Sequence, residues 1–63
     1  MSAEDILLAL SRHKEAWLTS KQIAKETSLS HSSIIHGLRG LRKSNSLLYR
    51  DWEYGYEYQH RPE

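Results

Sequence analysis

Apolar residues recur at every third or fourth position in three segments of this chain, and that spacing places them on one face of an α-helix. We therefore predict helices at about residues 3–12, 20–27 and 31–43. The positions expected to be buried on these helices are Ala3, Ile6, Leu7, Leu10, Ile23, Ala24, Ile34, Leu38 and Leu41. Leu8 falls outside the apolar face of the first helix, so it is expected either to be exposed singly or to contact a partner.

Short polar residues mark the ends of these segments. Thr19, followed three residues later by Gln22, has the spacing of a capping box, which begins a helix by satisfying free backbone N–H groups. Ser2 has an acidic residue at the same spacing, and Ser30 is expected to cap the third helix. Beyond that helix, Asn45 is expected to take the left-handed conformation that often ends a helix. These caps define helix boundaries that apolar spacing alone leaves open.

The C-terminal part of the chain is rich in aromatic residues at spacings typical of β-strands. We predict a β-hairpin at about residues 47–60, with Gly55 supplying a positive φ at its turn, and a very short strand at residues 17–18. The aromatic residues expected to complete a thin core are Trp17, Tyr49, Trp52, Tyr56 and Tyr58. Tyr54, at the tip of the hairpin, is expected to be exposed and is a candidate contact for a partner or a nucleic acid sugar. The predicted fold class is therefore α+β.

Two glycines lie inside the third predicted helix, where each costs about 1 kcal/mol relative to alanine. Gly37 and Gly40 fall on one flank of that helix. Close packing against a neighbouring element is the expected reason for their presence. A close approach by the backbone of another molecule is the alternative interpretation.

The composition indicates a single small domain over residues 1–63. The chain has no cysteine, and His31 and His36 point in different directions on a helix, so no metal site and no cofactor is expected. We find no glycine-rich phosphate loop and no nucleophile with an activating histidine, so an enzyme is not expected. The first apolar run ends at Leu10 and lacks the flanks of a signal peptide, which favours a soluble, cytoplasmic protein without a membrane span.

The net charge of +1 is unevenly distributed along the chain. Residues 29–50 hold four bases and no acid, whereas residues 51–63 hold four acids and one base. The face of the third helix opposite its leucines carries Ser32, His36, Arg39 and Lys43. Hydroxyls, an imidazole and cations suit a surface that meets DNA, because they reach base edges and phosphates in the major groove. A solvated helix face without a binding role is the alternative.

The order of helix, short strand, helix, three-residue turn, helix and β-hairpin resembles the winged helix-turn-helix superfamily. Residues 18–34 carry most of the likeness, and residues 47–50 resemble the strand that begins the wing. The spacing of the core residues is similar to that in many prokaryotic regulators, at Ile23, Ala24, Leu29, Ile34, Leu38 and Leu41. The resemblance implies a DNA-binding domain of the small prokaryotic or viral transcriptional-regulator type, with its third helix in the major groove.

The resemblance also implies which side chains meet double-stranded DNA. They are Ser20, Lys21, Ser30, His31, Ser32, Ser33, Ile35, His36, Arg39, Arg42, Lys43 and Arg50. Among these, Ile35 is expected to offer methyl groups to a thymine, and Arg39 to pair with a guanine or a phosphate. Arg42, Lys43 and Arg50 are expected to contact phosphates instead of bases.

The predicted hairpin departs from this pattern in its charge. It carries Asp51, Glu53 and Glu57, whereas the wing of DNA-binding relatives usually carries arginine or lysine. The alternative function is therefore a winged-helix module that binds a protein partner through its acidic, tyrosine-rich hairpin. For such a partner, or for a homodimer on a palindromic DNA site, the candidate surface residues are Leu8, Trp52 and Tyr54.

Overall fold

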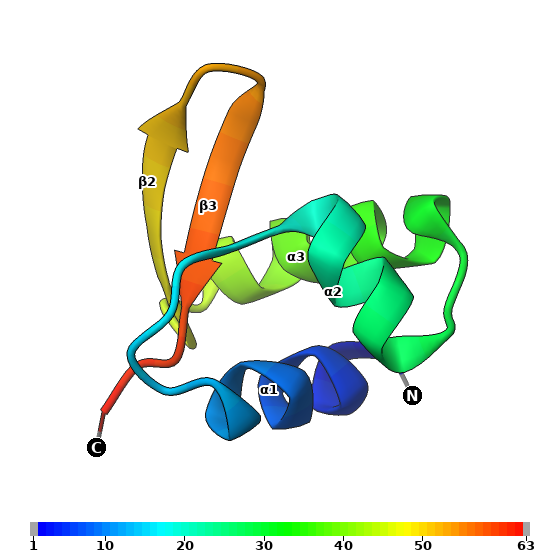
Figure 1. The fold of residues 1–63 in the computed structure, drawn as a ribbon, viewed down its shortest axis with the longest axis horizontal. Coiled ribbons are helices and arrows are strands. Elements are labelled where there is room, and N and C mark those ends of the chain that lie inside the picture. Colours follow the sequence, from blue (N-terminus) through cyan, green and yellow to red (C-terminus); the bar gives the residue numbers. More distant parts are fainter. Residues whose placement is uncertain (1, 63) are drawn as a thin grey trace.

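The computed structural model of the chain is a small α+β domain with three helices and a three-stranded antiparallel sheet (Figure 1). It describes residues 2–62. The elements are α1 (Ser2–Arg12), β1 (Leu18–Thr19), α2 (Ser20–Thr27), α3 (His31–Lys43), β2 (Leu48–Trp52) and β3 (Gly55–Gln59). The predicted boundaries of α2 and α3 are confirmed. The predicted α1 begins one residue too late, and the predicted first strand one residue too early.

The sheet has the strand order β1-β3-β2, so the C-terminal strand lies in its centre. Tyr58 of β3 is opposite Leu18 of β1 and Tyr49 of β2. Because successive side chains of a strand alternate between the two faces, Tyr58 lies on the face toward the helices and Glu57 on the other face. β2 and β3 form a hairpin that extends beyond the helices (Figure 1).

The core lies between the three helices and the base of the hairpin. α1 packs against both α2 and α3, and α2 also packs against α3. The buried core cluster consists of Ile6, Leu10, Ile23, Ile34, Leu38, Leu41, Leu47 and Tyr58. The predicted apolar faces of the helices therefore meet in one core, with Ala3, Leu7 and Ala24 packed at its border.

The capping residues account for where α2 and α3 begin and end. Thr19 and Gln22 form the predicted capping box, and the Ser30 hydroxyl accepts a hydrogen bond from the Ser33 backbone N–H at 3.3 Å. Ser28 ends α2 with a φ of 61°, and Asn45 follows α3 with a φ of 55°. The predicted left-handed Asn45 and the positive φ of Gly55, 137°, are confirmed. The cap predicted at the Ser2 side chain lies outside the described part of the structure.

Two expectations about packing are wrong. Tyr49, Trp52 and Tyr56 are exposed instead of completing the core. Trp52 and Tyr56 belong to the end of the hairpin near its turn, away from the helices, and Tyr49, opposite the buried Tyr58, lies on the edge strand β2. Their rings pack on neighbouring aromatic rings, as in the edge-to-face pair of Tyr49 and Tyr56 with centroids 5.6 Å apart. Gly40 is the second case: a Cβ built at this exposed residue meets no atom within 4 Å, so no neighbouring element requires a glycine there.

Within residues 2–62, no helix combines the length and the apolar character needed to cross a membrane.

Candidate functional site

The outward face of α3 is the first part of the candidate site. We define this face by its exposed polar residues, Ser32, His36, Arg39 and Lys43, which lie opposite the buried Ile34, Leu38 and Leu41. The sequence of α3 contains no aspartate or glutamate, so the face has no internal carboxylate to neutralise its cations. It can offer hydroxyl, imidazole, guanidinium and ammonium groups to a polar or anionic ligand.

The beginnings of α2 and α3 are held together by side-chain hydrogen bonds. The Ser20 hydroxyl and His31 Nε2 lie 2.9 Å apart, which links the first residue of α2 to the first residue of α3. At the cap of α3, the Ser30 hydroxyl also donates to the Ser33 hydroxyl at 2.9 Å. These contacts fix the positions of four predicted site residues relative to the outward face.

Arg42 joins α3 to the hairpin. Its Nη1 donates a hydrogen bond to the phenolic oxygen of Tyr58 at 2.9 Å, and its guanidinium carbon lies 4.8 Å from the centroid of the Tyr56 ring. Burial raises the pKa of the Tyr58 hydroxyl, and the positive charge and hydrogen bond of Arg42 oppose that rise. Arg42 is therefore a structural contact as well as a predicted phosphate contact.

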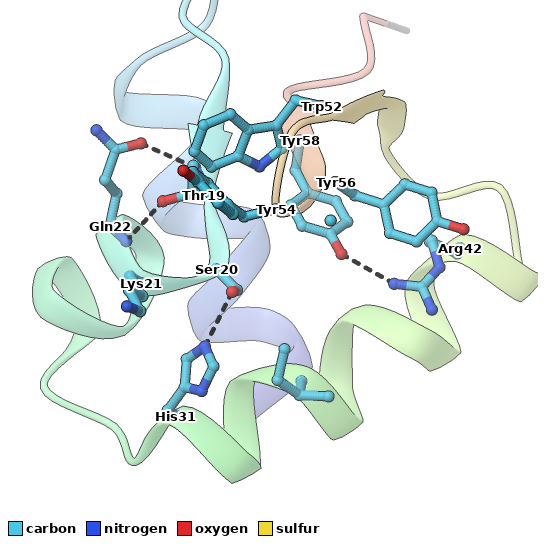
Figure 2. A pocket seen from close by; sticks show the side chains of 12 residues that line it. Thr19, Ser20, Lys21, Gln22, His31, Arg42, Trp52, Tyr54, Tyr56 and Tyr58 are labelled. Atoms are coloured by element: carbon cyan, nitrogen blue, oxygen red, sulfur yellow. Dashed lines mark hydrogen bonds between the residues drawn. The ribbon is translucent and has the colours of Figure 1, made fainter.

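A groove lies between the hairpin, the start of α2 and one flank of α3 (Figure 2). We call it the aromatic groove. It has a volume of about 570 Å³. Its lining consists of Thr19, Ser20, Lys21, Gln22, His31, Ile35, Arg42, Trp52, Tyr54, Gly55, Tyr56 and Tyr58. Figure 2 shows Trp52 and Tyr54 on the hairpin side of the groove, with Lys21 and His31 across from them. None of its described lining residues is acidic.

The aromatic groove brings together two sets of residues that sequence analysis separated. Lys21, His31 and Arg42 belong to the set predicted to meet DNA, whereas Trp52 and Tyr54 belong to the predicted partner surface. The folded chain makes them the walls of one site. Tyr56 and Tyr58 line it too. Tyr58 is also buried in the core, as predicted, whereas Tyr56 is exposed, and no sequence signal indicated either as a groove residue.

Arg50 and Leu8 lie apart from the groove. The Arg50 side chain is on the sheet face opposite Tyr58, where its Nε and Nη2 each lie 3.0 Å from Glu57 Oε1. Its guanidinium also stacks over Trp17, 4.1 Å from the ring centroid. Leu8 is 52% exposed on α1, which does not line the groove. The structure therefore does not bring these two residues together with the rest of the candidate site.

The hairpin carboxylates also separate into two kinds. Glu57 is paired with Arg50, so its charge is compensated within the sheet. Asp51 and Glu53 are exposed near the hairpin tip and outside the lining of the groove. The acidic character of the hairpin is therefore concentrated beside the groove and not in it.

Among residues 2–62, no group of three or more histidine, aspartate or glutamate side chains is placed to hold a metal ion. The side chains of the outward face and of the aromatic groove can stack on a ligand, form hydrogen bonds and contribute positive charge.

Comparison of the chain with family models, with curated proteins and with solved structures found no match.

Proposed function

We propose that this chain is a winged helix-turn-helix domain that binds double-stranded DNA, with α3 in the major groove, and that it regulates transcription. The order of elements and the hairpin beside α3 support this assignment. α3 has 13 residues, which at about 1.5 Å per residue make a rod about 20 Å long. The major groove of B-DNA, about 12 Å wide, admits a helix of this kind.

The observation that carries the proposal is the outward face of α3. Ser32, His36, Arg39 and Lys43 are all exposed, and no acid interrupts them. Arg39 pairs with guanine or phosphate, Ser32 and His36 hydrogen-bond to base edges, and Lys43 contacts a phosphate. Exposed Ile35, at the edge of this face, supplies the apolar contact to a thymine methyl.

A second candidate function is binding of a protein through the hairpin. Tyr54 is 79% exposed and Trp52 38% exposed, and the carboxylates of Asp51 and Glu53 lie beside them. Large exposed aromatic side chains are enriched at protein interfaces. On this reading the outward face of α3 is a solvated surface.

The test is binding of mixed-sequence duplex DNA, measured by fluorescence anisotropy at low salt. Arg39→Gln removes a charge from the outward face, and Arg12→Gln removes the same charge from the end of α1. We expect Arg39→Gln to weaken binding about fivefold or more, because a good arginine contact is worth about 1–3 kcal/mol. Arg12→Gln is expected to change the affinity less than about twofold. Absence of binding by the wild type at low salt would favour the protein-binding function.

A further inference from the structure

The aromatic groove exposes aromatic side chains of the hairpin that binding of duplex DNA by α3 does not require. Helix recognition of the major groove uses side chains on α3, yet this chain also holds Trp52 and Tyr54 exposed on the hairpin, facing Lys21 and His31 of α2 and α3 (Figure 2). Neither side chain is buried against the core. Exposed aromatic side chains that gather beside a groove forgo the stabilisation of burial, which is typical of a binding site.

We propose that the aromatic groove binds one unpaired nucleotide of a DNA strand, so that the preferred substrate is a duplex that continues into a single-stranded end. This inference rests on the proposed function, because α3 holds the duplex part of that substrate. It assigns Trp52 and Tyr54 to the nucleic-acid site instead of to a separate protein interface.

The rings at the hairpin tip are suited to stacking on a base. Trp52 and Tyr54 form an edge-to-face pair with centroids 5.4 Å apart and an interplanar angle of 87°. In such a pair the edge of one ring contacts a face of the other, so only one ring has a face covered, whereas a face-to-face stack covers one face of each ring. Tyr54 is 79% exposed, which leaves room for a base against it. Every base has a π-face, so this contact is tolerant of sequence.

The charges of the groove select an anionic ligand. Lys21 and Arg42 contribute positive charge, Ser20 contributes a hydroxyl, and no described lining residue is acidic. The hydrogen bond from Arg42 to Tyr58 uses one of the five N–H donors of its guanidinium. A nucleotide whose base stacks on Tyr54 and whose phosphate lies near these cations contacts both the aromatic and the positively charged residues of the groove. An uncharged peptide contacts only the aromatic residues favourably.

The size and position of the groove fit a single nucleotide next to a duplex. Its volume of about 570 Å³ is within the usual range of small-molecule sites, about 300–1,000 Å³. His31 and Ile35 line the groove and are also exposed on α3, so the groove adjoins the outward face. A strand leaving a duplex held on α3 therefore reaches the groove without crossing another element.

The experiment compares three probes by anisotropy: a blunt duplex, the same duplex with a short single-stranded end, and the single strand alone. We expect the wild type to bind the duplex with the single-stranded end about fivefold or more tightly than the blunt duplex, the gain of one stacked base. Tyr54→Ala should remove this gain and leave the affinity for blunt duplex unchanged, which also shows that the variant is folded. The matched control is Tyr54→Phe, which keeps the ring and should keep the gain.

Tryptophan fluorescence gives an independent readout. In a Trp17→Phe background the emission comes from Trp52, and we expect a thymine oligonucleotide to quench it. Equal wild-type affinity for blunt and extended duplexes would overturn the groove assignment and leave the proposed function standing. Quenching without any binding of blunt duplex would overturn the proposed function and the duplex part of this inference, and would leave the groove as a site for single-stranded DNA. Quenching by a proline-rich peptide but not by the oligonucleotide would make the groove a peptide site and overturn the inference.

Discussion

Arg42 links α3 to the hairpin, and its replacement should lower the free energy of unfolding of the domain. Arg42 donates a hydrogen bond to the hydroxyl of the buried Tyr58. Hydrogen bonds with a charged donor stabilise a fold by about 1.5–3 kcal/mol. Arg42 is only half-buried, so solvent screening reduces the contribution of this bond to about 1–1.5 kcal/mol. The guanidinium over the Tyr56 ring adds about 0.5–1 kcal/mol. Arg42→Met should therefore lower the free energy of unfolding by about 2 kcal/mol, and Tyr58→Phe by about 1–1.5 kcal/mol.

The assay is urea and thermal unfolding of the wild type, the two single variants and the double variant. For a domain of 63 residues the total stability is about 3–9 kcal/mol, and each 1 kcal/mol shifts Tm by about 4–8 °C. Because both single variants remove the same hydrogen bond, the double variant should be less destabilised than their sum, by about 1 kcal/mol.

The control for this cycle is Lys43→Met, which removes the neighbouring cation from an exposed position and should change stability by no more than about 0.5 kcal/mol. Fully additive effects of Arg42→Met and Tyr58→Phe would refute the reasoning, since two partners in one hydrogen bond must show coupling. Equal effects of Arg42→Met and Lys43→Met would refute it as well.

Three further outcomes follow from single positions. Ser28→Gly should raise stability by about 0.5–1 kcal/mol in urea unfolding, because glycine takes the left-handed conformation at φ 61° without steric cost; a loss of stability would contradict this. Gly40→Ala should stabilise α3 by about 1 kcal/mol, since its Cβ meets open space; lowered DNA affinity in the same variant would indicate close approach of a DNA backbone there. Burial raises the pKa of Tyr58, so the folded chain keeps that proton to higher pH than the unfolded chain. The stability that comes from keeping Tyr58 protonated is fully present below about pH 10 and is lost as the pH rises through the folded-state pKa. In alkaline denaturation curves, wild-type stability should therefore fall more steeply than that of Tyr58→Phe. Parallel curves for the two proteins would show that the Tyr58 pKa is not raised by folding.

The helices were predictable from the sequence because their signals are local. The spacing of Ile34, Leu38 and Leu41 identifies the buried face of α3, and the Thr19–Gln22 capping box identifies the start of α2. Both signals act within one or two turns of the chain. The exposure of Ser32, His36, Arg39 and Lys43 followed directly from the same periodicity.

The hairpin was less predictable because its environment depends on distant elements. Alternation along a strand separates two faces, but it does not say how far the helices extend beneath them. Tyr58 lies over the core and is buried, whereas Tyr56, two residues earlier on the same face, is exposed. The aromatic groove was hidden for the same reason, because Lys21 and Tyr54 are far apart in the sequence and meet only after folding.

The salt dependence of duplex DNA binding measures whether the outward face of α3 contacts the phosphate backbone. With Lys21, Arg39, Arg42 and Lys43 near DNA, the plot of log affinity against log salt should have a slope of about −2.7 to −3.6, from three or four phosphate contacts. Lys43→Gln should make that slope shallower by about 0.9, whereas Arg12→Gln should leave it unchanged. A slope near zero, or the same change in both variants, would contradict the account.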